Sequence, residues 1–487
     1  MDALHVRLVS PIGRPVESTK YVALSHCWGK VEAIKLLANN VGQFQNGIHI
    51  QDLPNSYQEA VRLCLSMGFT YIWIDSLCII QDSLEDWERE AKDMKRVYEH
   101  AIFNLCSATA SDSSGTSFIS RHANLLKPQR IKVQGEVLQL ISNSLFKDDI
   151  TYCTLRSRAW VYQEWYLSKR SLILGTHQLW WRCRRKLACE IRPLGVPEAP
   201  GLEWWTTAQN FKESETSIDK LSSMDAWNER VRDYMGTKLT RESDRMIAFS
   251  GIVQSFGKSR KISQEYLAGL WRCNLPAALL WYTLSSARRS ATYSAASWSW
   301  ASLAGHCQLT AGLNLLQEPC YLSIEHIGPL CKRGIYGFSL GGVIIISGFL
   351  FEVKYRDVDP SSSKCVFMDP SDPDIDGQLF WDEKSESEQF VSHLNAPNTD
   401  NFDQWLEQKA IRLITRIQEA QGNFHFLLSL DQGEMYHYRF RGLILYEPED
   451  QPGLFYRVGY MNWQRLPKGL LVHELPFRQE KRRISLL

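Results

Sequence analysis

The N-terminal part of the chain alternates between apolar runs and segments with apolar residues at helical spacing. Residues 21–28 form a mostly apolar run that predicts a buried strand. Residues 57–67 repeat apolar side chains at helical spacing, after a capping box at Ser56–Glu59 and before Gly68, which suits a helix end. The run 70–80 is apolar and rich in β-favouring residues, so it predicts a strand buried on both faces.

The same alternation continues along the next part of the chain. Residues 84–101 carry one apolar face and one charged face and follow a second capping box at Ser83–Asp86, which predicts a helix. Residues 102–108 predict a third strand, and the serine-rich stretch 107–117 predicts a loop. The order strand, helix, strand, helix, strand predicts right-handed crossovers and a parallel sheet.

Further elements are expected downstream of this sheet. Residues 127–150 predict a β excursion, residues 156–167 a helix, and residues 171–183 a pair of strands. Residues 203–290 predict mainly helices, with short helical pieces expected at 266–271 and 276–282 among others.

After residue 291 the pattern favours short strands, which we expect at 341–354, 424–431, 438–446 and 454–461. The stretch 356–404 is rich in Pro, Ser, Asp and Glu and predicts a loop insertion. These patterns divide the chain into an α/β domain at 1–175, a mainly helical region at 176–305 and a β-rich region at 306–487.

The composition, 44% hydrophobic and 22% charged, is that of an ordinary globular protein. A formal net charge of +1 and the lack of a zinc-finger or helix-turn-helix signature predict no nucleic-acid binding. The longest apolar run, at 343–351, is too short for a membrane-spanning helix. Since the N-terminus does not resemble a signal peptide, we expect a cytoplasmic or nuclear protein, with the cytoplasm as the simpler expectation.

The 12 cysteines of a chain without a secretory signal predict reduced thiols. There is no CxxC pair, and Cys183 and Cys189 have no His or Cys pair at zinc spacing nearby, so we expect no metal site. The glycine-rich patterns that cradle phosphates, GxGxxG and the P-loop, are also absent. The sequence therefore predicts no cofactor.

Two polar clusters follow predicted strands. Residues 25–28, Ser-His-Cys-Trp, end the first strand, and residues 75–78, Asp-Ser-Leu-Cys, end the second. In an open parallel α/β sheet ligands bind beyond the carboxyl ends of the strands, so both clusters are expected to face one crevice. A carboxylate at that depth needs a partner, and His26 or Arg158 can supply it. The alternative is structural: the thiols fill the core and the imidazole donates to a carbonyl.

Several segments resemble the fungal heterokaryon-incompatibility (HET) domain. The segments are YVALSHCWG at 21–29, YIWIDSLCIIQDSLEDWEREAKDMKRVYEHA at 71–101 and SRAWVYQEWYLSKRSLIL at 157–174. Three further segments resemble stretches that are common in HET proteins outside the domain itself. They are LTRESDRMIAFSGI at 239–252, YLAGLW at 266–271 and SWSWAS at 297–302. The domain resemblance covers about residues 21–175. One departure is Trp165, where the family usually has Arg, so any pair of that Arg with an acidic neighbour is missing here.

The resemblance implies a fungal protein with a role near non-self recognition, since HET domains are associated with programmed cell death when unlike hyphae fuse. It also implies a Rossmann-like or TIR-like parallel sheet, because the domain has been likened to TIR domains. Some TIR domains cleave NAD using a glutamate. HET-domain proteins also occur near fungal metabolite gene clusters, which suggests secondary metabolism as a further setting.

Two classes of function therefore stay open. An effector would act by self-association, by binding a protein partner, or through a small-molecule ligand in the crevice. An enzyme would use the crevice in one of two ways. In the first, Trp28 stacks on a nucleotide ring while Glu164 or Glu90 stabilises an oxocarbenium-like centre. In the second, Asp75 orients His26 as a base for an acid/base step on a small metabolite, with Cys27 or Cys78 as nucleophile.

The candidate site residues follow from these alternatives. The catalytic candidates are His26, Asp75 and Glu164. The ligand-binding candidates are Ser25, Cys27, Trp28, Cys78, Arg158, Trp160 and Gln163. Structural roles are the alternatives for three of the residues named here, with Glu90 on a solvated helix face, Gln163 as a buried amide and Arg158 as a residue that pins a loop.

Overall fold

The structure is a computed structural model that falls into two compact units. It describes residues 5–10, 19–29, 33–121, 129–140, 144–196, 224–263, 265–283, 288–289, 295–304, 307–308, 322–331, 341–348, 350–353, 364–366, 376–381, 422–434, 437–449, 451–463 and 481–487. The first unit comprises Met1–Leu221, Thr237–Leu239 and Ile247–Ser255, and the second comprises Ser222–Gly236, Thr240–Met246 and Phe256–Leu487.

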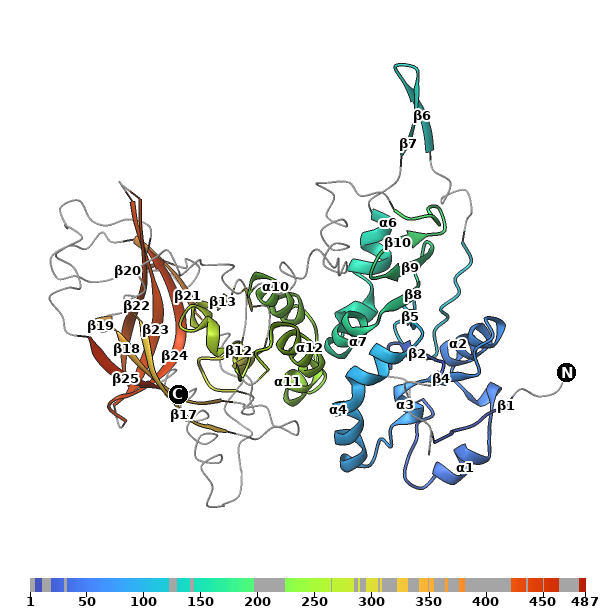
Figure 1. The fold of residues 1–487 in the computed structure, drawn as a ribbon, viewed down its shortest axis with the longest axis horizontal. Helices are drawn as coiled ribbons and strands as arrows, with labels where there is room; N and C mark the ends of the chain where they lie inside the picture. Colours follow the sequence, from blue (N-terminus) through green and yellow to red (C-terminus); the bar gives the residue numbers. More distant parts are fainter. Residues whose placement is uncertain are drawn as a thin grey trace. The chain divides into compact units, whose positions relative to one another are not determined.

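The first unit is built on a six-stranded sheet with the order β10-β9-β8-β5-β2-β4 (Figure 1). Its strands are β2 (Tyr21–Ser25), β4 (Tyr71–Trp73), β5 (Asn104–Ser107), β8 (Arg170–Leu174), β9 (Leu179–Cys183) and β10 (Leu187–Cys189). Strands β4, β2, β5 and β8 run parallel, which confirms the expected parallel arrangement for this part. The expectation of a purely parallel sheet is wrong, because the strand pair at 171–183 folds back as a hairpin and adds β9 and β10 antiparallel.

Strand β2 lies inside the sheet, and the chain passes from it first to β4 on one side and then to β5 on the other. This reversal places a topological switch point between β2 and β5, at their carboxyl ends. In doubly wound sheets the connections leave such a point in opposite directions and open a space where ligands bind. A ligand site in this fold is therefore expected near the residues that follow Ser25.

Helices cover both faces of the parallel strands. Helix α2 (Asn55–Ser66) packs against Val22 and Leu24 of β2. Helices α4 (Leu84–His100) and α7 (Ala159–Leu167) lie on the opposite face, where Ala23 belongs to their core. Because successive strand residues point to opposite faces, β2 is buried on both sides, with Val22 and Ala23 at 0% exposure.

The second strand is shorter than the pattern predicts. Strand β4 ends at Trp73, and residues Asp75–Cys78 form a helical turn, α3. The expectation of a strand across 70–80, buried on both faces, is therefore wrong. Strand β4 lies at the edge of the sheet, where Tyr71 is 40% exposed, and the amide of Cys78 donates to Ile74 O at 2.9 Å to close the turn. An apolar run alone does not distinguish a strand from a buried helical segment.

The helix ends agree only partly with the expected capping boxes. Helix α2 has Pro54 as its N-cap without a side-chain bond, while Ser56 Oγ donates to Ser113 O at 2.8 Å, so the first box is wrong. At α4, Ser83 Oγ accepts from the amide of Asp86 at 3.2 Å, as expected for the first half of a box. Gly68 follows α2 with a φ of 81°, which confirms it as the glycine that ends the helix.

Smaller elements complete the first unit. The β excursion is confirmed as the hairpin of β6 (Gln129–Val133) and β7 (Glu136–Leu140). Helix α7 begins at Ala159, later than the sequence indicates, because Thr154–Ser157 form a 3₁₀ turn and Arg158 is extended. The remaining elements are β1 (His5–Val6), α1 (Val41–Asn46), β3 (Ile48–His49), a 3₁₀ turn (Ile50–Asp52), α6 (Ser144–Phe146) and a π turn (Lys147–Thr151).

The second unit begins with helices and continues as an extended sheet. Helices α10 (Met224–Met235), α11 (Arg245–Ala248) and α12 (Ser250–Arg260), the last two of which have residues in both units, agree with the expected helical region. The expected helical piece at 266–271 is instead a tight hairpin of β11 (Tyr266–Leu267) and β12 (Leu270–Trp271). Ala268 and Gly269 turn the chain there with φ values of 45° and 102°.

A nine-stranded sheet carries most of this unit, with the order β17-β18-β25-β24-β23-β22-β19 and with β21 joining β24 and β20. These strands are β17 (Ser323–Cys331), β18 (Gly341–Gly348), β19 (Leu350–Val353), β20 (Lys364–Val366), β21 (Asp376–Trp381), β22 (Gly422–Glu434), β23 (His437–Pro448), β24 (Leu454–Trp463) and β25 (Arg482–Leu486). They confirm a β-rich C-terminal part. Strands β20 and β21 fall inside 356–404, and the rest of that stretch lies outside the described residues.

Short strands and 3₁₀ turns complete the second unit. They are the 3₁₀ turns Glu242–Asp244, Arg272–Asn274, Ala277–Leu280 and Trp300–Ser302 and the strands β13 (Tyr282–Thr283), β14 (Arg288–Arg289), β15 (Leu303–Ala304) and β16 (Cys307–Gln308). The turn at Ala277–Leu280 takes the place of the helical piece expected at 276–282. Within the part of the chain that the structure describes, no helix has the length and apolar character needed to cross a membrane.

Candidate functional site

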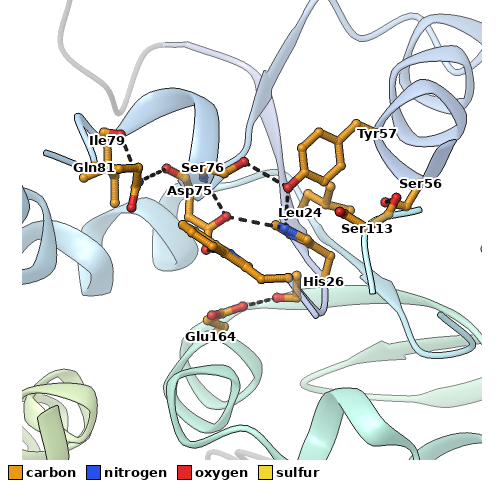
Figure 2. A network of polar contacts seen from close by, with 12 residues as sticks. Leu24, His26, Ser56, Tyr57, Asp75, Ser76, Ile79, Gln81, Ser113 and Glu164 are labelled. Carbon is orange, nitrogen blue, oxygen red and sulfur yellow. Dashed lines mark hydrogen bonds and ion pairs between the residues drawn. The ribbon is translucent and has the colours of Figure 1, made fainter. Parts of the chain in front are cut away.

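Two polar clusters meet at the carboxyl end of β2, one on each face of the sheet. Ser25 is the last residue of the strand and His26 follows it directly, so their side chains point in opposite directions. Figure 2 shows Tyr57 between His26 and Ser76, with Glu164 on the other side of the strand. The sequence cluster at 25–28 thus serves two separate networks.

The first cluster joins three buried polar side chains. Ser25 Oγ donates to Glu164 Oε2 and accepts from Asn104 Nδ2 at 2.9 Å. Ser25 lies on β2, Asn104 on the neighbouring strand β5 and Glu164 on α7 above them. All three are nearly inaccessible, with exposures of 1%, 0% and 4%. The cluster therefore satisfies a carboxyl group that the helix places inside the core.

Glu164 has an unusual proton affinity. Burial raises its pKa from an ordinary 4.5 to about 7, while the Arg158 charge and the hydrogen bonds of Ser25 and Tyr98 act in the opposite direction. A buried carboxyl group with this pKa holds its proton for part of the time near neutral pH. Such a group can donate or accept a proton under physiological conditions, which is what a general acid or base requires.

The second cluster is centred on His26. Its Nε2 lies 2.7 Å from Tyr57 Oη, which in turn lies 2.9 Å from Ser76 Oγ. The same Nε2 is 3.8 Å from Asp75 Oδ1. Asp75 Oδ2 accepts from Trp28 Nε1 at 2.8 Å, and Asp75 Oδ1 accepts from the amide of Ser76 at 2.7 Å. The structure thus brings together His26 and Asp75, as the sequence analysis expects for residues that end neighbouring strands.

His26 is a neutral imidazole at physiological pH. Burial lowers its pKa from 6.5 to about 4, and although Asp75 acts against this shift, Arg158 adds to it. The pairing with Asp75 is therefore a polar contact and not an ion pair at pH 7. Burial also raises the pKa of Tyr57 far above its usual range, so the phenol remains a hydrogen-bond donor. With a pKa of about 4, His26 is a weak base, so its Nε2 takes up a proton less readily than an ordinary imidazole.

Three residues of the site are partly accessible to solvent. Trp28, Asp75 and Arg158 are half-buried, whereas His26 and Glu164 are buried behind them. The indole of Trp28 lies nearly parallel to the imidazole of His26, with 10° between the planes and 6.5 Å between the centroids. Arg158 precedes α7 in an extended conformation, and its Nη1 donates to His26 O. A ligand that approaches the site meets these half-buried groups first.

The two cysteines of the predicted site are poor candidates for a nucleophile. Cys27 packs in a buried cluster with Cys106 and Trp165, and burial raises its pKa to about 11. Burial likewise raises the pKa of Cys78, on the helical turn α3, to about 12. Since the thiolate is the reactive form, both groups are almost entirely unreactive thiols at neutral pH.

Other candidates on α7 and α4 pack within the helical layer. Trp160 lies edge to face against Trp87 with centroids 6.1 Å apart. Gln163 is buried, and its Oε1 accepts from the amide of Gly251 at 3.3 Å. On α4, Glu90 Oε1 lies 3.3 Å from Arg89 Nη2.

Trp165, the departure from the HET pattern, lies close to two guanidinium groups. The Cζ atoms of Arg156 and Arg182 are 4.8 Å and 5.3 Å from its ring centroid. The ring face can attract both cations. An arginine in place of Trp165 would meet two like charges at this position.

A loop after β5 packs against the turn after β2. Gly29 has a φ of 70°, and a Cβ built on it would lie 2.1 Å from Asp112 Cβ. The loop is held on α2 by Ser56, whose amide and hydroxyl both donate to Ser113 O, at 3.3 and 2.8 Å. Only glycine fits where the two segments meet, so Gly29 allows the loop to approach the turn that follows the two clusters' shared strand.

Sequence reasoning did not select three residues that complete these networks: Tyr57, Ser76 and Asn104. In the sequence, Tyr57 fits the apolar face of an expected helix, and its hydroxyl gives no further signal. For Asn104 the sequence does contain a signal, because a side-chain amide inside an expected core strand needs hydrogen-bond partners. Among the described residues, no group of three or more His, Cys, Asp or Glu side chains is arranged to hold a metal ion.

Comparison with protein families agrees with the resemblance seen in the sequence. Residues 21–164 match the family model described as heterokaryon incompatibility protein (HET). This segment runs from the start of β2 to Glu164 and includes both polar clusters. The match identifies this segment as a HET domain. No curated protein and no solved structure matches the chain.

Proposed function

We propose that this protein is an effector of fungal non-self recognition whose HET domain acts through the polar site at the carboxyl end of β2. The observation that carries the proposal is the convergence of two networks on adjacent residues. Ser25 joins Glu164 on one face, and His26 joins Asp75 on the other, at the switch point of the sheet. Ligand sites occur at this position in doubly wound sheets, which supports a Rossmann-like or TIR-like interpretation.

Partial accessibility favours a ligand site over a purely structural network. A network that only stabilises the core has no need for exposed charge. Here Asp75 retains 21% of its side-chain exposure and sits beside the half-buried Trp28. Occupation of the site by a small molecule, in the cytoplasm, would then favour the state that self-associates or binds a protein partner and leads to programmed cell death.

A second candidate function is an enzyme, and the pKa of Glu164 favours it. A carboxyl group with a pKa of about 7 suits proton transfer near neutral pH. In a nucleotide glycohydrolase, the ionised Glu164 would stabilise an oxocarbenium-like centre while Trp28 stacks on a ring. In a tailoring enzyme of secondary metabolism, Asp75 would instead orient His26 as the base for a small metabolite.

The proposal is tested by growth arrest in a fungal host. We expect overexpression of the wild type to arrest growth, and Glu164→Gln and Asp75→Asn to abolish the arrest while they melt within a few degrees of the wild type. Glu85→Gln removes an exposed carboxylate from the first turn of α4 and serves as the control. If wild type and variants behave alike, or if only variants with a large loss of stability lose activity, the clusters hold the fold and the site has no effector role.

The same purified proteins separate the two candidates. Each is incubated with NAD and related nucleotides, and products are followed by chromatography. Turnover that disappears in Glu164→Gln would establish the glycohydrolase. Growth arrest without turnover of any nucleotide would favour the effector.

A further inference from the structure

The charged side chains near the end of β2 differ in how many of their hydrogen-bonding atoms have partners. Each Asp75 carboxylate oxygen already accepts a hydrogen bond, Oδ1 from the amide of Ser76 at 2.7 Å and Oδ2 from Trp28 Nε1 at 2.8 Å. On the other face, Glu164 Oε2 accepts from Ser25. The acidic groups of the site are therefore supplied with donors from the protein itself.

Arg158 is the exception. A guanidinium group has five N–H donors, and the hydrogen bond it makes within the described part of the chain goes from Nη1 to His26 O. No carboxylate of a described residue lies within ion-pair distance of it. The side chain is half-buried and tethered by its bond to β2, so its remaining donors are held at the site.

The surroundings of Arg158 favour an anion over a neutral ligand. Its positive charge lowers the pKa of His26 and acts against the raised pKa values of Cys27 and Glu164, so its field reaches both faces of β2. Neutral His26 brings no competing positive charge. Arg158 also precedes the first turn of α7, where the helix dipole adds a positive potential.

We propose that Arg158 binds an oxyanion, and that the ligand of this site is a small molecule that carries a phosphate or carboxylate group. The planar guanidinium offers paired N–H donors that match two oxygens of such a group. This inference rests on the proposed ligand site but adds the chemical class of the ligand. It assigns Arg158 direct contact with the ligand, with Glu164 and His26 buried behind it.

Isothermal titration calorimetry on the full chain tests the inference. The probes are inorganic phosphate, pyrophosphate, AMP and citrate, in a buffer of low ionic strength without phosphate. The variants are Arg158→Gln, which removes the charge, and Arg158→Lys, which keeps the charge and a donor for His26 O. Arg170→Gln is the matched control, because Arg170 also donates to a backbone carbonyl, Ile102 O at 3.4 Å, but lies at the start of β8, the opposite end of the sheet.

We expect saturable binding of at least one probe to the wild type, and binding about 10- to 100-fold weaker in Arg158→Gln, the range for loss of a charge-assisted hydrogen bond. Arg158→Lys should retain part of the affinity, and Arg170→Gln all of it. Binding of the three phosphate probes without citrate would identify the anion as a phosphate, and the reverse pattern as a carboxylate.

Two results would overturn the inference: no saturable binding of any probe to the wild type, or equal loss of affinity in Arg158→Gln and Arg170→Gln. Thermal melts of each variant show whether a loss reflects unfolding, in which case Arg158→Lys decides. The calorimetry measures anion binding and not growth arrest, so the anion-site proposal and the effector proposal can be contradicted independently. A wild type that binds an oxyanion without arresting growth contradicts only the effector role.

Discussion

At the residue scale, the site depends on side chains whose burial changes their proton affinity. Glu164 and His26 lie on opposite faces of β2, and burial shifts both towards their neutral forms. At pH 7 the imidazole of His26 is therefore neutral, and the carboxyl of Glu164 is neutral for part of the time. Near pH 7 the Glu164 carboxyl is close to its titration point and His26 is not, so Glu164 is the better placed of the two for proton exchange.

Glu164 predicts a specific dependence of stability on pH. Its folded pKa of about 7 lies above its ordinary value of 4.5, so its contribution is complete below pH 4.5 and is lost as the pH rises through 7. His26 has the opposite sign: with a pKa lowered from 6.5 to about 4, its contribution is present above pH 6.5 and lost as the pH falls through 4. Each shift corresponds to about 3 kcal/mol, so the two slopes nearly cancel between pH 4.5 and 6.5.

Removal of the Glu164 carboxyl should reveal the pH dependence of stability that His26 contributes. In Glu164→Gln we expect the free energy of unfolding to rise with pH between 4.5 and 6.5, and the wild-type decline towards pH 7 to disappear. Urea titrations at half-unit steps measure this, with Glu85→Gln as the control. Parallel curves for wild type and Glu164→Gln would show that the carboxyl titrates normally in the fold.

At the scale of elements, two segments pack closely beside the carboxyl end of β2. The turn at Gly29 and the loop at Asp112 approach so closely that no Cβ fits between them. These segments follow β2 and β5, the strands on either side of the switch point. Their contact depends on backbone geometry and not on any motif of reactive residues.

Gly29→Ala should therefore destabilise the domain and displace this loop. Gly68→Ala is a matched control, since Gly68 also has a positive φ, 81°, but its Cβ would meet nothing within 4 Å. We expect a loss of about 1 kcal/mol for Gly68→Ala from backbone strain and of roughly 2 to 4 kcal/mol for Gly29→Ala, where a steric clash is added. Chemical denaturation of both variants measures the difference, and equal losses would contradict the close approach of the loop.

At the scale of the whole molecule, the chain has two compact units, each with its own core. Asp149 of the first unit is a buried carboxylate that holds the turn between β8 and β9. It accepts from the His177 amide and Nδ1, both at 2.9 Å, from the Gln178 amide at 3.2 Å and from Trp180 Nε1 at 2.9 Å. Its removal leaves these donors without their acceptor in that unit alone.

We expect unfolding in more than one step, because separate cores need not lose their packing together. Asp149→Ala should lower the midpoint of one transition by the equivalent of roughly 3 kcal/mol or more and leave the other in place. His177→Ala, which removes one of the four donors, should have a small effect. Differential scanning calorimetry of the three proteins is the measurement. A single transition that shifts as a whole would show that the units unfold as one.

Much of the first unit could be predicted from the local sequence. The alternation of apolar runs and helical patterns gives β2, α2, α4 and β5, because burial on two faces or on one stripe leaves a visible period. The HET motifs and the polar residues at 25–28 and 75–78 point to the end of the sheet where the structure places both polar clusters. These features depend on neighbours along the chain and are therefore present in the sequence itself.

Tertiary structure decided the rest. The helical turn α3 replaces strand after Trp73, and the hairpin of β8 and β9 makes the sheet mixed. Tyr57 and Asn104 join the site only because α2 and β5 pack beside β2, and the pKa of Glu164 depends on the depth to which α7 buries it. Contacts between residues far apart in the chain carry no local period, so strand order, partners and proton affinities arise only when the core is assembled.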